Sequence, residues 1–287
     1  MNVEDVRAAK FAPVPQTYTT RDTILYALSV GFASKPRDPA HLNFLQEDGL
    51  QAVPTMANVL GYPGLWMADA RFGLGWQRIL QAEHRLALHA PLPASGTIVG
   101  QNAVIALEDR GERGAMLHQR NDITEQGTGR HLASSTMSIL FQQDGGCGNW
   151  GTPPEKLAPL PDRAPDSEAT VASWEAQPLL YRLSGDLHPL HVNPAVAQAM
   201  GFERPILHGL ATMGMAGYAV LRDYADMAPD RLRALDVRFS APVLPGDILR
   251  IAFWDEGGGL IRFCATVPER DGVKVLDRGT ARLTLTP

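Results

Sequence analysis

A proline-rich stretch divides this chain into two halves of similar size. Five prolines fall between Gly151 and Pro165. Because proline lacks a backbone donor and fixes φ, we expect this stretch to run extended over the surface as a linker. The chain has 287 residues, enough for two compact domains. We therefore predict an N-terminal domain over residues 1–150, a linker over residues 151–170 and a C-terminal domain over residues 171–287.

The two halves resemble each other in their pattern of strands and turns. In the first half, residues 85–93 lead through a Pro/Gly turn into residues 96–99. In the second half, residues 236–245 lead through a similar turn into residues 246–249. Alternation of apolar and other residues along the later runs is typical of strands with one buried face. The pattern predicts a duplicated unit of one long helix and several antiparallel strands; two unrelated α+β domains are the alternative.

The sequence predicts three helices, two of them from their capping residues. Thr19 followed by Asp22 resembles a capping arrangement at the start of one helix. Asn193 and the proline after it should begin a short helix, and Gly201 should end it. Residues 209–224 are the longest helical candidate of the chain.

Two glycines inside this long candidate indicate how it packs. Gly214 and Gly217 cost helix stability, because glycine loses more backbone freedom than other residues. Their presence suggests that a sheet approaches the helix very closely. A helix wrapped by a curved sheet has this requirement.

Composition and charge argue against several classes of function. The net charge is −5, whereas nucleic-acid binding needs a basic face. There are two cysteines, too few for a disulfide framework, which favours a reducing compartment. The acidic N-terminus contains no apolar signal segment, and no stretch approaches the roughly 18 uninterrupted apolar residues of a membrane span. We therefore expect a cytoplasmic protein that binds neither nucleic acid nor membranes.

Residues 181–194 gather polar groups just before a helix. An acid, Asp186, and an imidazole, His191, are five positions apart in this segment, and Pro189 stiffens the chain between them. Such a loop can bring both side chains to one small volume, where they can hold a water molecule and move its protons. The structural alternative is that Asp186 caps a turn and His191 fills a hydrogen bond in the core.

Gly209 supplies a second piece of chemistry at the start of the long helical candidate. Free N–H groups at a helix N-terminus point outward with the positive end of the helix dipole, which makes an oxyanion site. An acid/base pair and an oxyanion donor are the groups needed to add water across a double bond conjugated to a thioester. Close packing of the helix against a sheet is the structural alternative for this glycine, and both can hold.

These residues resemble the signature of the MaoC-like family, and more closely that of the type 2 enoyl-CoA hydratases found as a domain of peroxisomal multifunctional enzymes. The signature reads Tyr-Arg-Leu-Ser-Gly-Asp-x-Asn-Pro-Leu-His-x-Asp-Pro, followed by Pro-Ile-Leu-His-Gly-Leu. The chain matches it between Tyr181 and Leu210, except that His188 replaces the Asn and Asn193 replaces the last Asp. The resemblance covers most of the chain.

The resemblance implies a double hot-dog fold of the α+β class. Such a fold has two repeats, each an antiparallel sheet wrapped around a helix; the second repeat carries catalysis, and the helix of the first is degenerate and leaves room for a bulky acyl chain. The implied enzyme is an (R)-specific 2-enoyl-CoA hydratase, which adds water reversibly and in syn fashion to a trans-2-enoyl-CoA to give the (3R)-3-hydroxyacyl-CoA. Coenzyme A is then part of the substrate, and we expect no separate cofactor.

The resemblance also assigns roles by position. Asp186 and His191 would hold the water, and Gly209 would give the oxyanion amide. Substrate contacts would come from Leu187, His188, Pro189, Leu190, Asn193 and Phe239. Phe239 would lie along the thioester arm, although plain core packing is an equal alternative. The family also uses a His-Gly step before the Glu of the first-half strand; Gln81 and Ala82 stand there in this chain, so its substrate preference can differ.

His188 has a consequence of its own. A neutral imidazole can position the substrate or Asp186 by hydrogen bonds, as the family's amide would. A charged imidazole would stabilise the ionised form of Asp186 and weaken it as an acid. We therefore expect activity to survive this departure but to fall at acidic pH.

Several alternatives stay open at this point. Within the family, the enzyme can act as a dehydratase on a branched, dicarboxylic or steroid-side-chain hydroxyacyl-CoA. Outside it, a hot-dog thioesterase would aim water at the carbonyl carbon, and a non-catalytic acyl-CoA binding protein would hold the ligand without turnover. We expect no metal site, because the eight histidines are scattered and His188 and His191 lack further ligands at useful spacing. By analogy with other hot-dog proteins we expect a homodimer.

Overall fold

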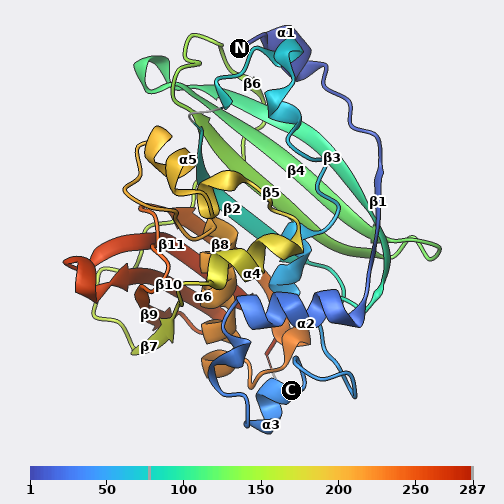
Figure 1. Cartoon of the computed structure of the whole chain (residues 1–287), viewed down its shortest axis with the longest axis vertical. Helices are drawn as coiled ribbons and strands as arrows, with labels where there is room; N and C mark the ends of the chain where they lie inside the picture. Colours follow the sequence, from blue (N-terminus) through green and yellow to red (C-terminus); the bar gives the residue numbers. More distant parts are fainter. Residues whose placement is uncertain (77–78, 286–287) are drawn as a thin grey trace.

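One continuous antiparallel sheet organises the chain in the computed structural model, which describes residues 1–76 and 79–285 (Figure 1). Its strands are β1 (Val14–Tyr18), β2 (Ile79–Leu88), β3 (Gly96–Asp109), β4 (Ala115–Glu125), β5 (His131–Phe141), β6 (Trp150–Gly151), β7 (Ser167–Ala172), β8 (Leu232–Phe239), β9 (Ile248–Asp255), β10 (Leu260–Val267) and β11 (Val273–Leu283). They follow the order β1-β3-β4-β5-β2-β8-β11-β10-β9-β7 across the sheet, and the short β6 pairs with β3 outside this path. The expected antiparallel strands of both halves are therefore confirmed.

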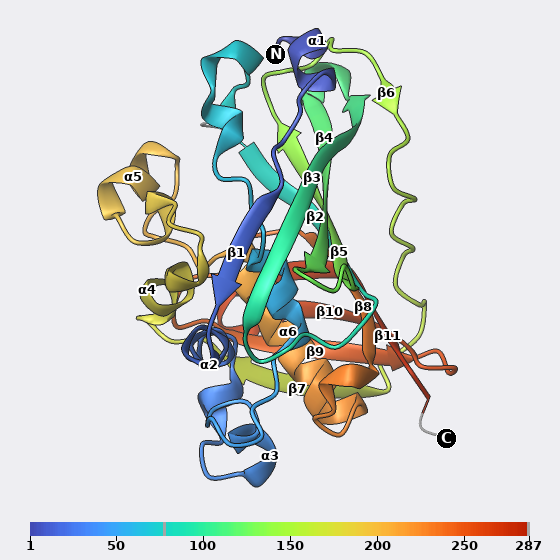
Figure 2. The ribbon, with the colours of Figure 1, turned by 90° about the vertical axis from the view of Figure 1, so that its right-hand side faces the viewer.

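The strand order is symmetric about the β2–β8 pair. Moving outward from this pair, β5, β4, β3 and β1 follow on one side, and β11, β10, β9 and β7 follow on the other. Adding six to each strand number of the first half gives its counterpart in the second half. Figure 2 shows the strands of the first half running upright and β9–β11 running across them, so the sheet is strongly twisted. The predicted duplication of one strand unit requires this matching order.

Three of the helices lie where the sequence predicts them. Those of the described residues are α1 (Val3–Arg7), α2 (Thr20–Ser29), α3 (Pro39–Leu42), α4 (Gln177–Tyr181), α5 (Pro194–Ala199) and α6 (Gly209–Tyr224). In α2, the backbone N–H of Thr19 donates to Asp22 Oδ2 at 2.8 Å, which completes one side of the capping box. Asn193 caps α5, and α6 spans the expected residues. All three helices expected from the sequence are confirmed.

Helix α6 forms the centre of the main core. Every residue from Ala211 to Leu221 is buried, and the cluster around them includes side chains from the strands of both halves. Between α3 and β2, where the first half would have its own long helix, the described residues form only short 3-10 helices, of which Pro54–Val59 contacts α6, β2 and β5. The helix of the first repeat is therefore degenerate, and the sheet of that repeat helps to cover α6.

The two glycines within α6 pack against different partners. A Cβ built at Gly214 would lie 2.6 Å from Cγ1 of Val30, which is the residue that ends α2. A Cβ at Gly217 would lie 2.9 Å from Thr55 Cγ2 and 3.3 Å from Leu235 Cδ2. Only the second glycine thus approaches the sheet, and the expectation of sheet contact was wrong for Gly214. The nearest neighbours of the two glycines are Val30 and Thr55, and both belong to the first half of the chain.

The proline-rich linker crosses the outer side of the second half (Figure 2). Residues 152–166 contain no helix or strand, and arginine side chains of β10 and β11 hold them: Arg262 donates to Pro159 O at 3.1 Å, and Arg278 donates to Leu157 O at 3.0 Å. Strand β7 already begins at residue 167. Residues 167–170, the last four of the predicted linker, pair with β9. The domain boundaries themselves stay a prediction.

The close contact between Gly214 and Val30 generates a first prediction. Gly214→Ala gains about 1 kcal/mol of helix propensity, but the new methyl group meets a fully buried Val30, and overpacking costs about 1–3 kcal/mol. We expect a net loss of about 1 kcal/mol in the free energy of unfolding. In a Val30→Ala background the clash is gone, and Gly214→Ala should become neutral or stabilising. Urea unfolding of the four proteins tests this, and an equal loss in both backgrounds would refute it.

A half-buried acid lies at the seam between the halves. Asp236 on β8 is opposite Arg85 on β2. Burial raises the pKa of Asp236 from its ordinary 3.8 to about 6, although the charge of Arg85 and a backbone hydrogen bond from Leu86 oppose the shift. Because the folded pKa exceeds the unfolded one, the folded protein holds this proton more tightly. The carboxylate therefore costs stability above about pH 6, and this cost disappears as the pH falls toward 4.

Asp236→Asn should raise the free energy of unfolding at pH 7.5 by about 1–3 kcal/mol, the size of the linkage for a shift of roughly two units. The gain over the wild-type protein should shrink steadily between pH 6 and pH 4. Urea unfolding of both proteins at pH 4.5, 6 and 7.5 measures it, and Asp230→Asn, at an exposed position near the start of β8, is the control. A gain that does not depend on pH would contradict this account of the seam.

Candidate active site

The loop between α4 and α5 carries the expected acid and base. Helix α4 continues into the 3-10 helix Arg182–Ser184, and Gly185, with φ +126°, turns the chain just before Asp186. His191 ends the next 3-10 helix, Pro189–His191. A carboxylate oxygen of Asp186 and a ring nitrogen of His191 lie within 4.8 Å of each other. The structure thus brings the two side chains together, while their catalytic roles stay a prediction.

Hydrogen bonds orient both side chains. His191 Nδ1 lies 2.9 Å from Ile206 O. Because a carbonyl oxygen only accepts, Nδ1 carries the proton in the neutral ring and Nε2 keeps a lone pair. Asp186 Oδ1 accepts a hydrogen bond from the backbone N–H of His188 at 3.2 Å. One water molecule placed between Asp186 and His191 Nε2 can therefore exchange protons with either group.

The surroundings of His191 keep it neutral. Burial lowers the pKa of His191 below its ordinary value, and the negative charge of Asp186 opposes this shift. At neutral pH the ring is therefore unprotonated at Nε2. It can accept a proton there, as a general base must.

Gly209 opens α6 at the place expected for an oxyanion donor. The residue before it caps the helix without a side-chain hydrogen bond, and the first N–H groups of a helix have no partner within the helix. A Cβ built at Gly209 would lie 3.3 Å from Cε1 of Phe239, at the end of β8. The structure therefore confirms that Gly209 begins the helix and lets Phe239 pack closely, and its role as an oxyanion donor stays a prediction.

The position of His188 explains how an imidazole can replace the family's amide. His188 Nδ1 accepts a hydrogen bond from the backbone N–H of Leu190 at 3.2 Å, which caps the 3-10 helix. An asparagine there would offer its side-chain oxygen to the same N–H in an Asx turn. The bond to Asp186 comes from the backbone of residue 188 and does not depend on the side chain. The substitution therefore preserves the turn while the ring is neutral.

The remaining expected contacts lie in different surroundings. Leu190 is buried, whereas Leu187 is 59% exposed and Pro189 is exposed. Asn193 Oδ1 accepts from the backbone N–H of Ala195 at 2.9 Å as the cap of α5. The structure thus gives Asn193 a structural role, and its contact with substrate stays a prediction.

His208 is a member of the site that the sequence interpretation missed. It is 1% exposed, and its ring stacks on that of His191 with centroids 3.7 Å apart and planes 25° apart. Its Nε2 lies 3.2 Å from the backbone oxygen of Asp186. The signal was present in the His-Gly step that begins α6, but the 17 positions that separate His208 from His191 hid their contact.

His208 also changes the argument about metals. Asp186, His191 and His208 each offer a ligand atom within 4.8 Å of the others, so the sequence argument overlooked a third ligand. Imidazole binds a metal through a lone pair in the plane of its ring. Because the rings of His191 and His208 are stacked, their in-plane lone pairs do not converge on one ion. The geometry favours a proton-handling site over a metal centre.

A polar network occupies the position where the family has its first-half His-Gly step. Strand β2 shifts register between Gln81 and Glu83. Gln81 Nε2 lies 3.1 Å from Nδ1 of the buried His84, and His84 Nε2 lies 3.0 Å from Asn58 Oδ1. Burial lowers the pKa of His84 to about 3. Gln81 is therefore held by an uncharged network.

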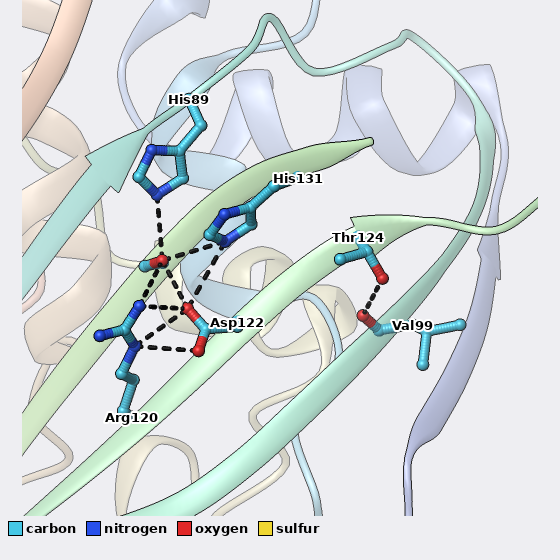
Figure 3. Close-up of polar contacts among 7 residues, drawn as sticks. His89, Val99, Arg120, Asp122, Thr124 and His131 are labelled. Atoms are coloured by element: carbon cyan, nitrogen blue, oxygen red, sulfur yellow. Dashed lines mark hydrogen bonds and ion pairs between the residues drawn. The ribbon is translucent and has the colours of Figure 1, made fainter. Parts of the chain in front are cut away.

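A second polar cluster lies on β4 and β5 and in the turn after β2 (Figure 3). Ser134 Oγ donates to Asp122 Oδ1 at 2.5 Å and lies 3.0 Å from His89 Nε2 and 3.1 Å from His131 Nε2. Arg120 Nε donates to both carboxylate oxygens of Asp122 at 2.9 Å. A serine nucleophile gives its proton to a histidine, whereas Ser134 gives it to the carboxylate. The cluster is therefore a closed ion-pair network and not a hydrolytic triad.

Two cavities bear on where an acyl chain can lie. The larger, about 460 Å³, is lined by residues 50–54, 88–94 and 229–233 and touches none of the expected site residues. The smaller, about 130 Å³, lies between β1, α2 and the 3-10 helix before β2, and it reaches Leu183 and Ser184. Because only the smaller cavity adjoins the loop that carries the acid and base, it is the better candidate despite its size.

Both halves of the chain match families of known proteins. Residues 156–275 match the MaoC like domain, and residues 16–143 match the MFE-2 hydratase 2 N-terminal domain. A probable enoyl-CoA hydratase 2 from Dictyostelium discoideum is 33% identical over 291 residues, which cover 98% of this chain and 96% of that protein. The chain belongs to the MaoC-like dehydratase family.

Solved structures agree with this assignment. The crystal structure of a MaoC-like dehydratase from Phytophthora capsici aligns over 100% of both chains, with a TM-score of 0.88 and 28% identity. A Mycobacterium tuberculosis protein with a double hotdog fold aligns over 99% of this chain and 98% of its own, with a TM-score of 0.58 and 16% identity. The second likeness concerns the fold alone. Together with the symmetric sheet, these structures confirm the double hot-dog fold.

Proposed function

We propose that this protein is an (R)-specific 2-enoyl-CoA hydratase. The observation that carries the proposal is the convergence of Asp186 and His191 in one loop, with Gly209 at the start of the neighbouring α6. The names of the relatives, enoyl-CoA hydratase 2 among them, support the same reaction. A thioester substrate brings its own activated carbonyl, so the reaction needs no redox cofactor.

The chemistry follows from the positions of these groups. In hydration, the oxygen of a water held between Asp186 and His191 bonds to the β-carbon of the enoyl group. The carbon–carbon double bond breaks, and its electron pair passes to the thioester oxygen, where the Gly209 N–H stabilises the negative charge. The acid/base pair takes up one proton of the water, and the other stays on the new hydroxyl group. As the thioester carbonyl re-forms, the pair returns one proton to the α-carbon, so its own protonation state is restored. By microscopic reversibility the same groups exchange roles in dehydration.

The surroundings of the pair suit a thioester with an apolar tail. Phe239 lies against Gly209, where it can flank the thioester arm. Leu190 offers a buried apolar side chain in the loop of the acid and base, and the small cavity beside Ser184 adjoins the same loop. These features support an acyl-CoA substrate, and a dehydratase acting on a branched or steroid-side-chain hydroxyacyl-CoA would use the same groups.

We further propose a homodimer in the cytoplasm. The buried Cys264 and the partly buried Cys147 are both free thiols, as in a reducing compartment. Among the described residues, no helix has the length and apolar character that crossing a bilayer requires. Some relatives are named as peroxisomal, so fractionation of cells is the deciding measurement for location. Light scattering on the purified protein decides the oligomeric state.

The pure protein should consume a medium-chain trans-2-enoyl-CoA, seen as loss of the conjugated enoyl absorbance, and form the 3R alcohol. Asp186→Asn should lower kcat by at least about 100-fold, the size of a general acid–base contribution. Asp230→Asn, at an exposed position outside the site, is the matched control. Release of free coenzyme A would instead indicate a thioesterase, and tight binding without turnover would indicate an acyl-CoA binding protein.

His188→Asn should make the enzyme less sensitive to acid. Protonation at Nδ1 would end the ring's role as acceptor for the Leu190 N–H and would place a charge near Asp186. We therefore expect the activity of the wild-type enzyme to fall more steeply on the acid side than that of the variant, while both are similar at pH 8. The profile of kcat/KM between pH 5 and 9 shows this, with His131→Asn as control. Superimposable profiles would rule the explanation out.

A further inference from the structure

His208 is the buried neighbour of the acid/base pair. It immediately precedes Gly209, so it joins the catalytic loop to the start of α6. Its side chain is almost fully buried, and the polar atoms of buried side chains are as a rule hydrogen-bonded. The proposed mechanism assigns it no proton transfer, which raises the question of what it does.

Two contacts connect His208 to both catalytic side chains. Its Nε2 lies 3.2 Å from the backbone oxygen of Asp186, and because that oxygen only accepts, Nε2 is the protonated nitrogen. Its ring stacks on His191 at 3.7 Å. On the remaining side, the ring of Tyr181 lies 4.8 Å away, at an angle of 47°. His208 is thus enclosed by the residues that it connects.

The charge state of His208 is fixed by these neighbours. Burial, and then the nearby His191, lower the pKa of His208 to about 3; Asp186 opposes the shift, and Arg182 adds to it. The Nδ1 atom is buried and has no hydrogen-bond partner among the described residues. The ring is therefore neutral over the working range of an enzyme, with one donor and one stacking face in use.

We propose that His208 is a positioning residue that holds Asp186 and His191 in register with the Gly209 amide. The inference rests on the hydratase function proposed above and deepens it. Through its Nε2–H, His208 fixes the backbone of Asp186, and through its ring it fixes the plane of His191. Because His208 and Gly209 are adjacent, the orientations of Asp186 and His191 are both fixed relative to the start of α6. The proposed oxyanion donor, the Gly209 N–H, points from the same helix end.

Two substitutions separate the contacts. His208→Phe keeps a flat ring on His191 but removes the donor to Asp186, whereas His208→Gln keeps a donor at about the reach of Nε2 but removes the stack. We expect His208→Phe to lower kcat about tenfold, the effect of one lost hydrogen bond to a buried carbonyl, with KM nearly unchanged. In His208→Gln, His191 loses the ring that buries it, so its pKa should rise and the acid limb of the kcat/KM profile should move to higher pH.

NMR titration does not require turnover, so it can test the positioning role of His208 separately from the proposed hydratase reaction. Titration of the ¹⁵N imidazole signals by NMR should show His208 as the neutral Nε2–H tautomer from pH 5 to 9 in the wild-type protein. It should also show a raised pKa of His191 in His208→Gln but not in His208→Phe. If the wild-type protein shows no hydratase activity but these signals hold, the positioning role stands and the reaction is wrong.

Three results would overturn the positioning role. The first is a charged ring or an Nδ1–H tautomer for His208 in the wild-type protein, a measurement that needs no variant to fold. The second is an unchanged kcat in a folded His208→Phe protein, as judged by its thermal transition. The third is a His191 titration that does not differ between the two variants.

Discussion

The pairing of β2 with β8 is the interaction on which the rest of the structure depends. Residues 83–87 lie opposite residues 234–238, and this ladder joins two sheets that would otherwise expose unpaired edges. Its register is also fixed by burial, because Leu86 and Leu235 point into the core, and a slip of one residue would turn both to the other face. Since β8 directly follows α6 and ends at Phe239, the same register sets what lies beside Gly209.

The sheet is symmetric in its strand order, but the elements that pack against it differ between the two halves. The strand order repeats, but the long helix occurs before β8 and not before β2. Among the described residues, α6 therefore packs with strands of both halves in the main core, and its N-terminus lies next to the loop with Asp186 and His191. The larger cavity lies at the first-half turn, residues 88–94, which corresponds to the turn after Phe239. The first-half turn contains leucine, alanine and proline residues. The first half therefore has a cavity there but no counterpart of the Asp186 and His191 pair.

The sequence predicted features that depend on neighbouring residues and missed those that depend on distant ones. The caps at Thr19 and Asn193 and the bounds of α6 are local, since each is decided within a few residues. The partner of Gly214 is Val30, and the two lie in different halves of the chain. The loop with Asp186 and His191 was found because both residues lie in one short segment. No pattern within a segment could have shown that His208 stacks on His191.

The surroundings of these residues also bear on the choice between the structural and catalytic interpretations of the loop, while the catalytic roles stay a prediction. A turn-capping aspartate and a core histidine would each be satisfied by the protein. Here Asp186 accepts one backbone hydrogen bond, and His191 uses Nδ1 for Ile206 while its Nε2 keeps a lone pair. Both residues therefore have one function in the fold and further hydrogen-bonding capacity for a ligand. Because His208 constrains both of them without itself titrating, the loop can be rigid and still exchange protons.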